Sequence, residues 1–297
     1  MSSAQALDTP ISHPRPMTTV TADGVTLHGT FYPAAEPLST PSAVLICSGT
    51  GIKQGFYRSF AQWLSERGHD VLTFDYRGIG ASLHETHVRH SKARKQDWGQ
   101  QDIPAMLEWL ARESGLEQVV LFGHSAGGQF TGVIPNYRRI ARMVGVASST
   151  GYIGYSPLHF RLLAGGLLKL YMPLANGVLG YTPCQWIGWG EDLPPGVARQ
   201  WSQWCCSPGY VANALGTDIQ QDYHQQLQLP MTFIHAVDDP IATRGNVADL
   251  TRLYPAAQIR VQTLIPAQHG LRHIGHIDFF RRSHQGLWPL LAEAIEK

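Results

Sequence analysis

The 297-residue chain is poor in charge, in cysteine and in long apolar runs. Charged residues make up 15% of it, and 23 Lys and Arg nearly balance 22 Asp and Glu, which leaves a net charge of +1. A balance this even provides no overall electrostatic field that would attract nucleic acid or an anionic membrane. The composition therefore favours a small neutral or mixed-charge ligand, and we expect no nucleic-acid partner.

The four cysteines do not form a recognisable framework. Cys205 and Cys206 are adjacent, Cys47 lies inside an apolar segment, and Cys184 has no C-x-x-C partner. This spacing indicates free thiols in a reducing compartment. The first 16 residues are polar and rich in proline, without the basic patch and apolar core of a secretion signal. We expect a cytoplasmic protein with a flexible leader over residues 1–16.

Long apolar runs are also missing. A membrane-spanning helix needs roughly 20 continuous apolar residues. The closest candidate, residues 162–179, is interrupted by Lys169, Pro173 and Asn176. We therefore expect no stable membrane insertion.

What the chain does contain is an alternation of short apolar runs and segments with helical periodicity. Asp23-Gly24 marks a tight turn between two strands within residues 19–31. The later apolar runs lack polar alternation, as strands buried on both faces do. Predicted strands are 43–47, 71–74, 119–122, 141–147, 231–235 and 259–264; predicted helices are 56–67, 98–110, 246–254 and 286–295. This order predicts an α/β fold, a mostly parallel sheet with helices on both faces and an antiparallel edge hairpin.

The alternation stops between residues 151 and 229, a stretch rich in aromatic residues. Short helices are expected over 160–171 and 197–204, with prolines 173, 183, 194 and 195 as breaks. We interpret the stretch as a helical cap over the carboxyl ends of the strands, where open α/β sheets place their sites. The alternative is a structural subdomain that does not contact substrate. The predicted organisation is a leader (1–16), a first core part (17–150), the cap (151–229) and a second core part (230–297).

The pentapeptide Gly123-His124-Ser125-Ala126-Gly127 directly follows the apolar run 119–122. It matches G-x-S-x-G, the strand–turn–helix elbow that exposes a nucleophilic serine. Ser125 is therefore the candidate nucleophile.

A serine hydroxyl needs a base to accept its proton, and the base needs a carboxylate to orient it. Asp238 and Asp239 follow the predicted strand 231–235, and either could be the acid: Pro240 fixes the turn after Asp239, whereas Asp238 could form the turn. Among the histidines after residue 265, we favour His276, which opens an apolar segment, and the nearest rival is His273.

A metal site is the other interpretation of these histidines, because His269, His273 and His276 are closely spaced. No nearby Cys or Glu completes such a site, and Gly270 and Gly275 weaken any helix that would align them. We expect neither a metal nor a cofactor.

An oxyanion hole requires two backbone N–H groups. Ala126 supplies one candidate. The second should come from Ser48-Gly49-Thr50-Gly51, after the strand 43–47, where small residues allow close approach; Thr50 is preferred and Gly51 is the alternative. A phosphate-binding loop is not favoured, because the segment lacks G-x-x-x-x-G-K-[ST].

With these parts in order, the chain resembles the α/β-hydrolase superfamily over nearly all of its length beyond residue 16. The elbow, the Asp-Asp-Pro turn and the late Gly-His follow in the family's order, and residues 75–82 look like its loop after the fourth strand. Residues 57, 98–99, 190–194 and 274–281 are similar to a group of uncharacterised bacterial α/β hydrolases, often described as similar to serine aminopeptidases or monoacylglycerol lipases.

The resemblance implies a triad in which Asp239 is the acid and His276 the base. One departure is Ser48-Gly49, where many members have His-Gly. The resemblance implies no substrate, because many acyl chemistries share this fold. We expect a serine hydrolase acting on an ester-type bond of a small, apolar acyl substrate. The alternatives are an acyltransferase with the same triad and a non-catalytic ligand-binding protein. The oligomeric state is not predicted.

Overall fold

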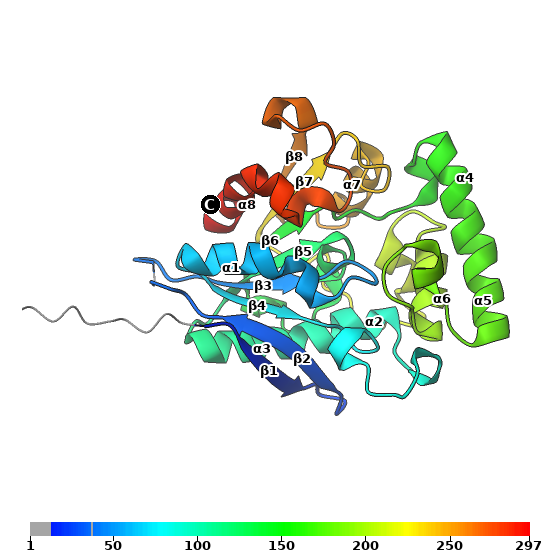
Figure 1. Ribbon diagram of the computed structural model, residues 1–297, viewed down its shortest axis with the longest axis horizontal. Coiled ribbons are helices and arrows are strands. Elements are labelled where there is room, and N and C mark those ends of the chain that lie inside the picture. The colour runs from blue at the N-terminus through cyan, green and yellow to red at the C-terminus, as the bar shows by residue number, and fades with distance from the viewer. Residues whose placement is uncertain (1–12, 37) are drawn as a thin grey trace, which may run out of the picture.

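The computed structural model describes residues 13–36 and 38–297. In this part of the chain eight strands form one sheet, in the order β1-β2-β4-β3-β5-β6-β7-β8 (Figure 1). The strands are β1 (Arg15–Val20), β2 (Thr26–Tyr32), β3 (Ala43–Cys47), β4 (Asp70–Phe74), β5 (Val119–His124), β6 (Ile140–Val146), β7 (Pro230–Ala236) and β8 (Gln258–Leu264).

The pairing of the strands follows from their apolar pattern. β1 and β2 form an antiparallel hairpin at one edge, β2 pairs antiparallel with β4, and the strands from β4 to β8 are paired in parallel. Every residue of β3 and β5 is buried, because strands covered on both faces carry apolar side chains throughout. The predicted α/β sheet with an antiparallel edge is confirmed.

The helices are α1 (Arg58–Glu66), α2 (Lys95–Asp97), α3 (Ile103–Ser114), α4 (Leu158–Gly166), α5 (Met172–Leu179), α6 (Pro195–Trp204), α7 (Arg244–Thr251) and α8 (Trp288–Glu296). Figure 1 shows α1 and α8 on one face of the sheet and α3 on the other. Trp63 of α1 and Trp288 of α8 are in contact, with ring centroids 5.7 Å apart. Aromatic packing thus joins the two helices of that face, which come from opposite ends of the chain.

The predicted leader lies mostly outside the described residues, which begin at residue 13. β1 starts at Arg15, so the last two residues assigned to the leader belong to the edge hairpin. β2, the second strand of the hairpin, pairs with β1 there, with Phe31 opposite Arg15.

The expected α-helix after the elbow is wrong. The chain instead forms short 3₁₀ turns over Ser125–Gly128 and Thr131–Val133. Gly128, Gly132 and Pro135 all disfavour a regular helix here.

The expected break at Pro173 is also wrong. α4, a π-helical segment (Leu167–Tyr171) and α5 form one continuous helix, Leu158–Leu179. The wider π turn just before Pro173 relieves the clash between the proline ring and the preceding turn. By length and composition alone this 22-residue helix, with a mean hydropathy of 1.4, is the one helix among the described residues that could cross a membrane.

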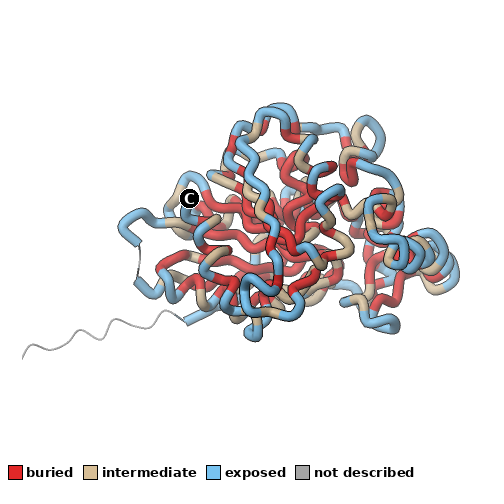
Figure 2. Tube along the Cα trace, turned by 90° about the horizontal axis from the view of Figure 1, so that it is seen from above, coloured by how far each residue is buried: buried red, intermediate tan, exposed pale blue. Residues whose placement is uncertain are grey.

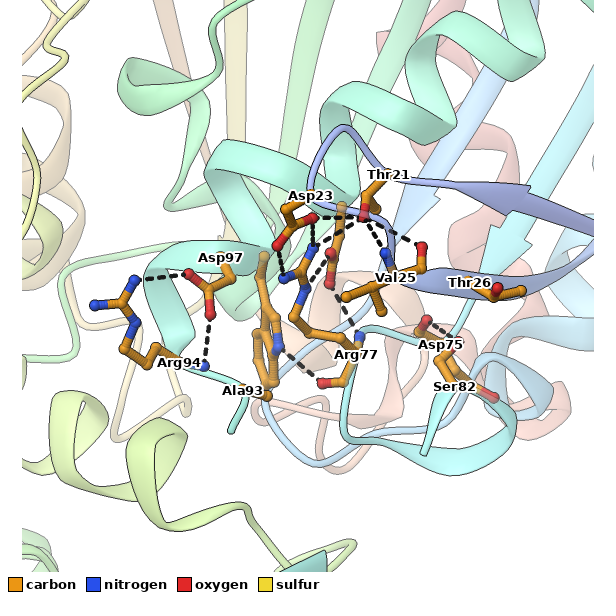
Figure 3. Close-up of polar contacts among 12 residues, drawn as sticks. Thr21, Asp23, Val25, Thr26, Asp75, Arg77, Ser82, Ala93, Arg94 and Asp97 are labelled. Carbon is orange, nitrogen blue, oxygen red and sulfur yellow. Dashed lines mark hydrogen bonds and ion pairs between the residues drawn. The ribbon is translucent and has the colours of Figure 1, made fainter. Parts of the chain in front are cut away.

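Arg77 fixes the loop that follows β4, the segment Asp75–Ser82 that carries part of the family resemblance. Its guanidinium contacts Asp23 in the hairpin turn (2.6 Å) and Asp102 at the start of α3 (2.6 Å) (Figure 3). The hydrogen bond from Arg77 lowers the pKa of Asp23 to about 2. Asp75 accepts the N–H of Gln54 (2.7 Å), which lies just beyond the candidate oxyanion loop. This motif therefore supports the architecture around the site.

Candidate active site

Ser125 follows β5 in the sharp turn that the elbow requires. Its φ of 49° is in the left-handed region that non-glycine residues rarely adopt. The flanking glycines permit this turn: a Cβ on Gly123 would lie 2.2 Å from the Gly128 nitrogen, and one on Gly127 would lie 2.1 Å from the Cys47 carbonyl oxygen. The G-x-S-x-G spacing therefore reflects backbone packing between the elbow and β3.

Three segments far apart in sequence meet at Ser125. His276 Nε2 lies 2.9 Å from Ser125 Oγ, and His276 Nδ1 lies 2.8 Å from Asp239 Oδ2. Asp239 follows β7, and His276 lies in the loop beyond β8. The predicted nucleophile, base and acid are thus hydrogen-bonded in series, with the Asp239 side chain fully buried and that of His276 13% exposed.

The surroundings of Asp239 favour its ionised form. Its Oδ1 accepts the N–H groups of Ile241 and Ala242, each at 2.8 Å. Burial alone would raise the pKa of Asp239, but the charge and hydrogen bond of His276 and the two N–H groups outweigh it, and the pKa is lowered. Asp239 can therefore hold the Nδ1 proton of His276 and stabilise its positive charge.

The rival residues have different surroundings. Asp238 accepts the N–H groups of Ile274 (2.9 Å) and Gly275 (3.1 Å), so it shapes the loop that carries His276. The His273 side chain is 62% exposed and lies 3.6 Å from Asp238. Geometry therefore favours Asp239 and His276. Within residues 13–36 and 38–297, no cluster of three or more His, Cys, Asp or Glu side chains could hold a metal ion.

The preferred oxyanion residue of the loop after β3 lies on the same cavity as Ser125 and His276. Gly49 and Thr50 line that cavity, and Ala126 is the residue after the nucleophile. The Gly51 carbonyl accepts the N–H of Glu191 at 2.8 Å, which ties the loop to the segment before α6.

A buried lysine stands behind Thr50. The Lys95 side chain is fully buried, its Nζ donates a hydrogen bond to Thr50 Oγ1, and it lies 4.6 Å from the ring centre of Trp98 and 5.3 Å from that of Trp201. Burial lowers the pKa of Lys95 to about 7. The sequence gives no sign of this burial, because a lysine in a polar stretch ordinarily faces solvent.

A buried hydrogen-bond chain joins the three loops of the site. The Gly49 N–H donates to the Tyr57 hydroxyl (3.0 Å), Tyr57 Oη lies 2.7 Å from His124 Nδ1, and His124 Nε2 lies 2.9 Å from the carbonyl oxygen of His276. A carbonyl only accepts, so Nε2 carries the proton of a neutral His124. Nδ1 is then the acceptor for the Tyr57 O–H.

The electrostatics agree with these roles. Burial, together with the neighbouring His276, lowers the pKa of His124 to about 3, and burial raises the pKa of Tyr57 well above its usual value. Both groups therefore stay neutral at ordinary pH. We refer to Gly49, Tyr57, His124 and the His276 carbonyl as the loop-linking chain. It connects the oxyanion loop, the elbow and the base.

The cavity above Ser125 has a volume of about 420 Å³. Its walls include Phe160, Ala164 and Leu168 of the Leu158–Leu179 helix and Trp201 of α6. The segment expected to be a cap thus contributes directly to the cavity that contains the nucleophile.

The sheet order, the strained serine after β5, and the acid and histidine after later strands define the α/β-hydrolase fold, and this chain has that fold. Residues 39–182 match the family described as serine aminopeptidase, S33.

Curated relatives are similar to part of the chain. The putative carbamate hydrolase RutD of Caulobacter vibrioides is 34% identical over 116 residues, which are 38% of this chain and 38% of that protein. The uncharacterized protein YfhR of Salmonella typhi is 28% identical over 110 residues, or 36% of this chain and 35% of that protein. Each match therefore spans well under half of the relative.

Solved structures are similar over nearly the whole chain. A hypothetical protein from Pseudomonas aeruginosa superposes with a TM-score of 0.65 at 16% identity, covering 99% of this chain and 98% of that one. A monoglyceride lipase variant from Saccharomyces cerevisiae has a TM-score of 0.64 at 16% identity, covering 96% and 97%. At these identities the similarity concerns the fold.

Proposed function

We propose that the protein is a serine hydrolase that cleaves an ester-type bond of a small, apolar acyl substrate through an acyl-enzyme. The observation that carries this proposal is the series of hydrogen bonds from Ser125 through His276 to Asp239, at 2.9 and 2.8 Å. The similarity to a putative carbamate hydrolase and to a monoglyceride lipase adds support for hydrolytic chemistry.

The geometry suggests a role for each group. Ser125 Oγ attacks the carbonyl carbon while His276 Nε2 takes its proton, and Asp239 stabilises the resulting imidazolium. The N–H groups of Thr50 and Ala126 stabilise the negative charge on the carbonyl oxygen. His276 then gives its proton to the leaving alcohol. A water molecule, activated in turn by His276, releases the acid and restores Ser125.

The walls of the cavity favour an apolar acyl group. Ile153, Phe160, Leu168, Trp189 and Trp201 line it, and aliphatic and aromatic side chains of this kind bind substrate by removing apolar surface from water. The volume of about 420 Å³ suits a ligand of small-molecule size. These side chains do not call for a peptide substrate.

The proposal is tested by hydrolysis of a panel of p-nitrophenyl esters, thioesters, lactones and aminoacyl amides with increasing acyl length. We expect the esters with apolar acyl groups to be cleaved fastest. Ser125→Ala should lower kcat/KM by at least about a thousandfold, because the remaining triad cannot replace the nucleophile. Ser283→Ala, which removes an exposed hydroxyl, is the matched control and should retain full activity. Unchanged turnover by the Ser125→Ala protein, or cleavage of the amides alone, would refute the proposal.

A further inference from the structure

The Leu158–Leu179 helix leaves a row of large apolar side chains in solvent, which we call the outer face. Its members are 58–81% exposed: Leu158, Leu162, Leu163, Leu170, Leu174 and Val178. Figure 1 shows this helix at the right-hand end of the molecule, and at that end in Figure 2 the tube is largely the pale blue of exposed residues. Single exposed leucines are ordinary, but a contiguous apolar row of this kind marks an interaction surface.

The opposite side of the same helix is occupied. Leu167, Leu168 and Met172 are buried, and Phe160 and Ala164 line the active-site cavity. Lipid therefore cannot surround the helix unless the cap is taken apart, so the helix is not placed to span a bilayer. An amphipathic helix with one side anchored in protein can instead lie in the plane of a lipid surface.

The charges on the helix indicate which kind of surface would fit. Arg161 and Lys169 are its only Lys, Arg, Asp or Glu residues, and both are exposed. A second copy packed on the outer face would bring like charges together without an acidic partner on either helix, which is unfavourable. Anionic lipid headgroups instead complement Arg161 and Lys169 while the acyl region receives the leucines. Because the net charge of the whole chain is small, this attraction to anionic lipid comes from the helix alone.

We propose that the outer face docks the protein onto anionic lipid bilayers, with the Leu158–Leu179 helix lying along the surface. A helix of 22 residues presents an apolar strip about 33 Å long. Docking does not depend on turnover. Its consequence, that apolar esters enter the cavity from the lipid, rests on the proposed function.

The test uses the full chain carrying Ser125→Ala, so that binding is measured without hydrolysis. Co-sedimentation compares vesicles of phosphatidylcholine with vesicles of equal parts phosphatidylcholine and phosphatidylglycerol. We expect binding to the anionic vesicles that weakens with added salt. Leu162→Glu with Leu170→Glu should lower the partition coefficient at least about tenfold, because two exposed leucines that would enter the lipid become charged. Lys169→Gln should lower it about fivefold on anionic vesicles only.

The matched control adds the same charge at exposed apolar positions far from the helix. Val20→Glu with Val261→Glu changes side chains that are 62% and 47% exposed, on β1 and β8. This variant should bind vesicles nearly as well as its parent. When the two double variants are made in the protein that keeps Ser125, both should hydrolyse a soluble ester as fast as that protein does. This result shows that both variants fold.

Three results would overturn the proposal. One is no vesicle binding by a folded parent. Another is an equal loss in both double variants, which would reflect added charge alone. A third is a parent protein that does not bind vesicles and is a dimer in light scattering, where Leu162→Glu with Leu170→Glu converts the dimer to a monomer. That result would assign the outer face to a second copy. Failure to cleave esters with intact vesicle binding would refute the proposed function alone.

Discussion

Replacing Tyr57 by phenylalanine removes one oxygen atom from the centre of the loop-linking chain. The ring is fully buried and packs edge-on against Phe280, with centroids 5.0 Å apart, so phenylalanine keeps the packing. The Gly49 N–H and His124 Nδ1 both lose their partner. Each buried polar group left unsatisfied costs about 1–3 kcal/mol. We therefore expect Tyr57→Phe to lower the free energy of unfolding by roughly 2–6 kcal/mol.

The same change should reduce catalysis. Gly49 precedes Thr50, and a loosened oxyanion loop no longer holds its N–H group at the position where negative charge develops. Loss of one oxyanion donor costs about 100- to 1000-fold in kcat, so a displaced donor should cost about 10- to 100-fold. The effect should fall on kcat more than on KM, because the apolar walls that bind the acyl group are unchanged.

Urea denaturation and steady-state kinetics with the best p-nitrophenyl ester measure both effects. Tyr210→Phe is the matched control: Tyr210 is also fully buried, but its hydroxyl has no hydrogen-bond partner among the described residues. Removing that hydroxyl should change stability by less than about 0.5 kcal/mol or raise it. If Tyr57→Phe is as stable and as active as Tyr210→Phe, the loop-linking chain does not support the site.

Further predictions concern the triad and the buried lysine. In ester hydrolysis, His276→Ala should lower kcat/KM at least about a thousandfold, whereas His273→Ala should retain most activity; the reverse result would reassign the base. Asp239→Asn should lower kcat about 10⁴-fold, and Asp238→Asn should cost far less, because Asp239 bonds the His276 ring whereas Asp238 accepts backbone N–H groups of the loop that carries it. Burial lowers the pKa of Lys95 to about 7, so the unfolded chain binds this proton more tightly than the folded protein does. The free energy of unfolding should therefore rise with pH between about 7 and 9. Lys95→Met should flatten that rise, and urea midpoints at the two pH values measure it; an equally steep rise in the variant would contradict the assignment.

The fold could be predicted where local chemistry decides the structure. Uninterrupted apolar runs such as 43–47 predicted buried parallel strands, and Asp23-Gly24 predicted the hairpin, because each signal lies within a few neighbouring residues. The continuous helix through Pro173 could not be predicted this way. It depends on a π turn, which proline rules for regular helices do not describe.

The candidate site shows a similar division. Ser125 could be selected because it directly follows a strand, whereas the choice of Asp239 and His276 over Asp238 and His273 depends on the resemblance to a known family pattern. The partnership of Tyr57 with His124 spans 67 positions and depends on packing between loops. Lys95 was missed for another reason: its charge predicts exposure, and only the two indole rings and the Thr50 hydroxyl around it explain its burial.

The central claim is that Ser125 is a nucleophile activated by His276. Labelling with a fluorophosphonate probe, followed by mass spectrometry of the digested protein, tests it most directly. We expect a single phosphonate adduct on the peptide that contains Ser125, with labelling slowed at least about a hundredfold by His276→Ala and unchanged by His273→Ala. An adduct on another serine, or labelling of Ser125 at the same rate without His276, would contradict it.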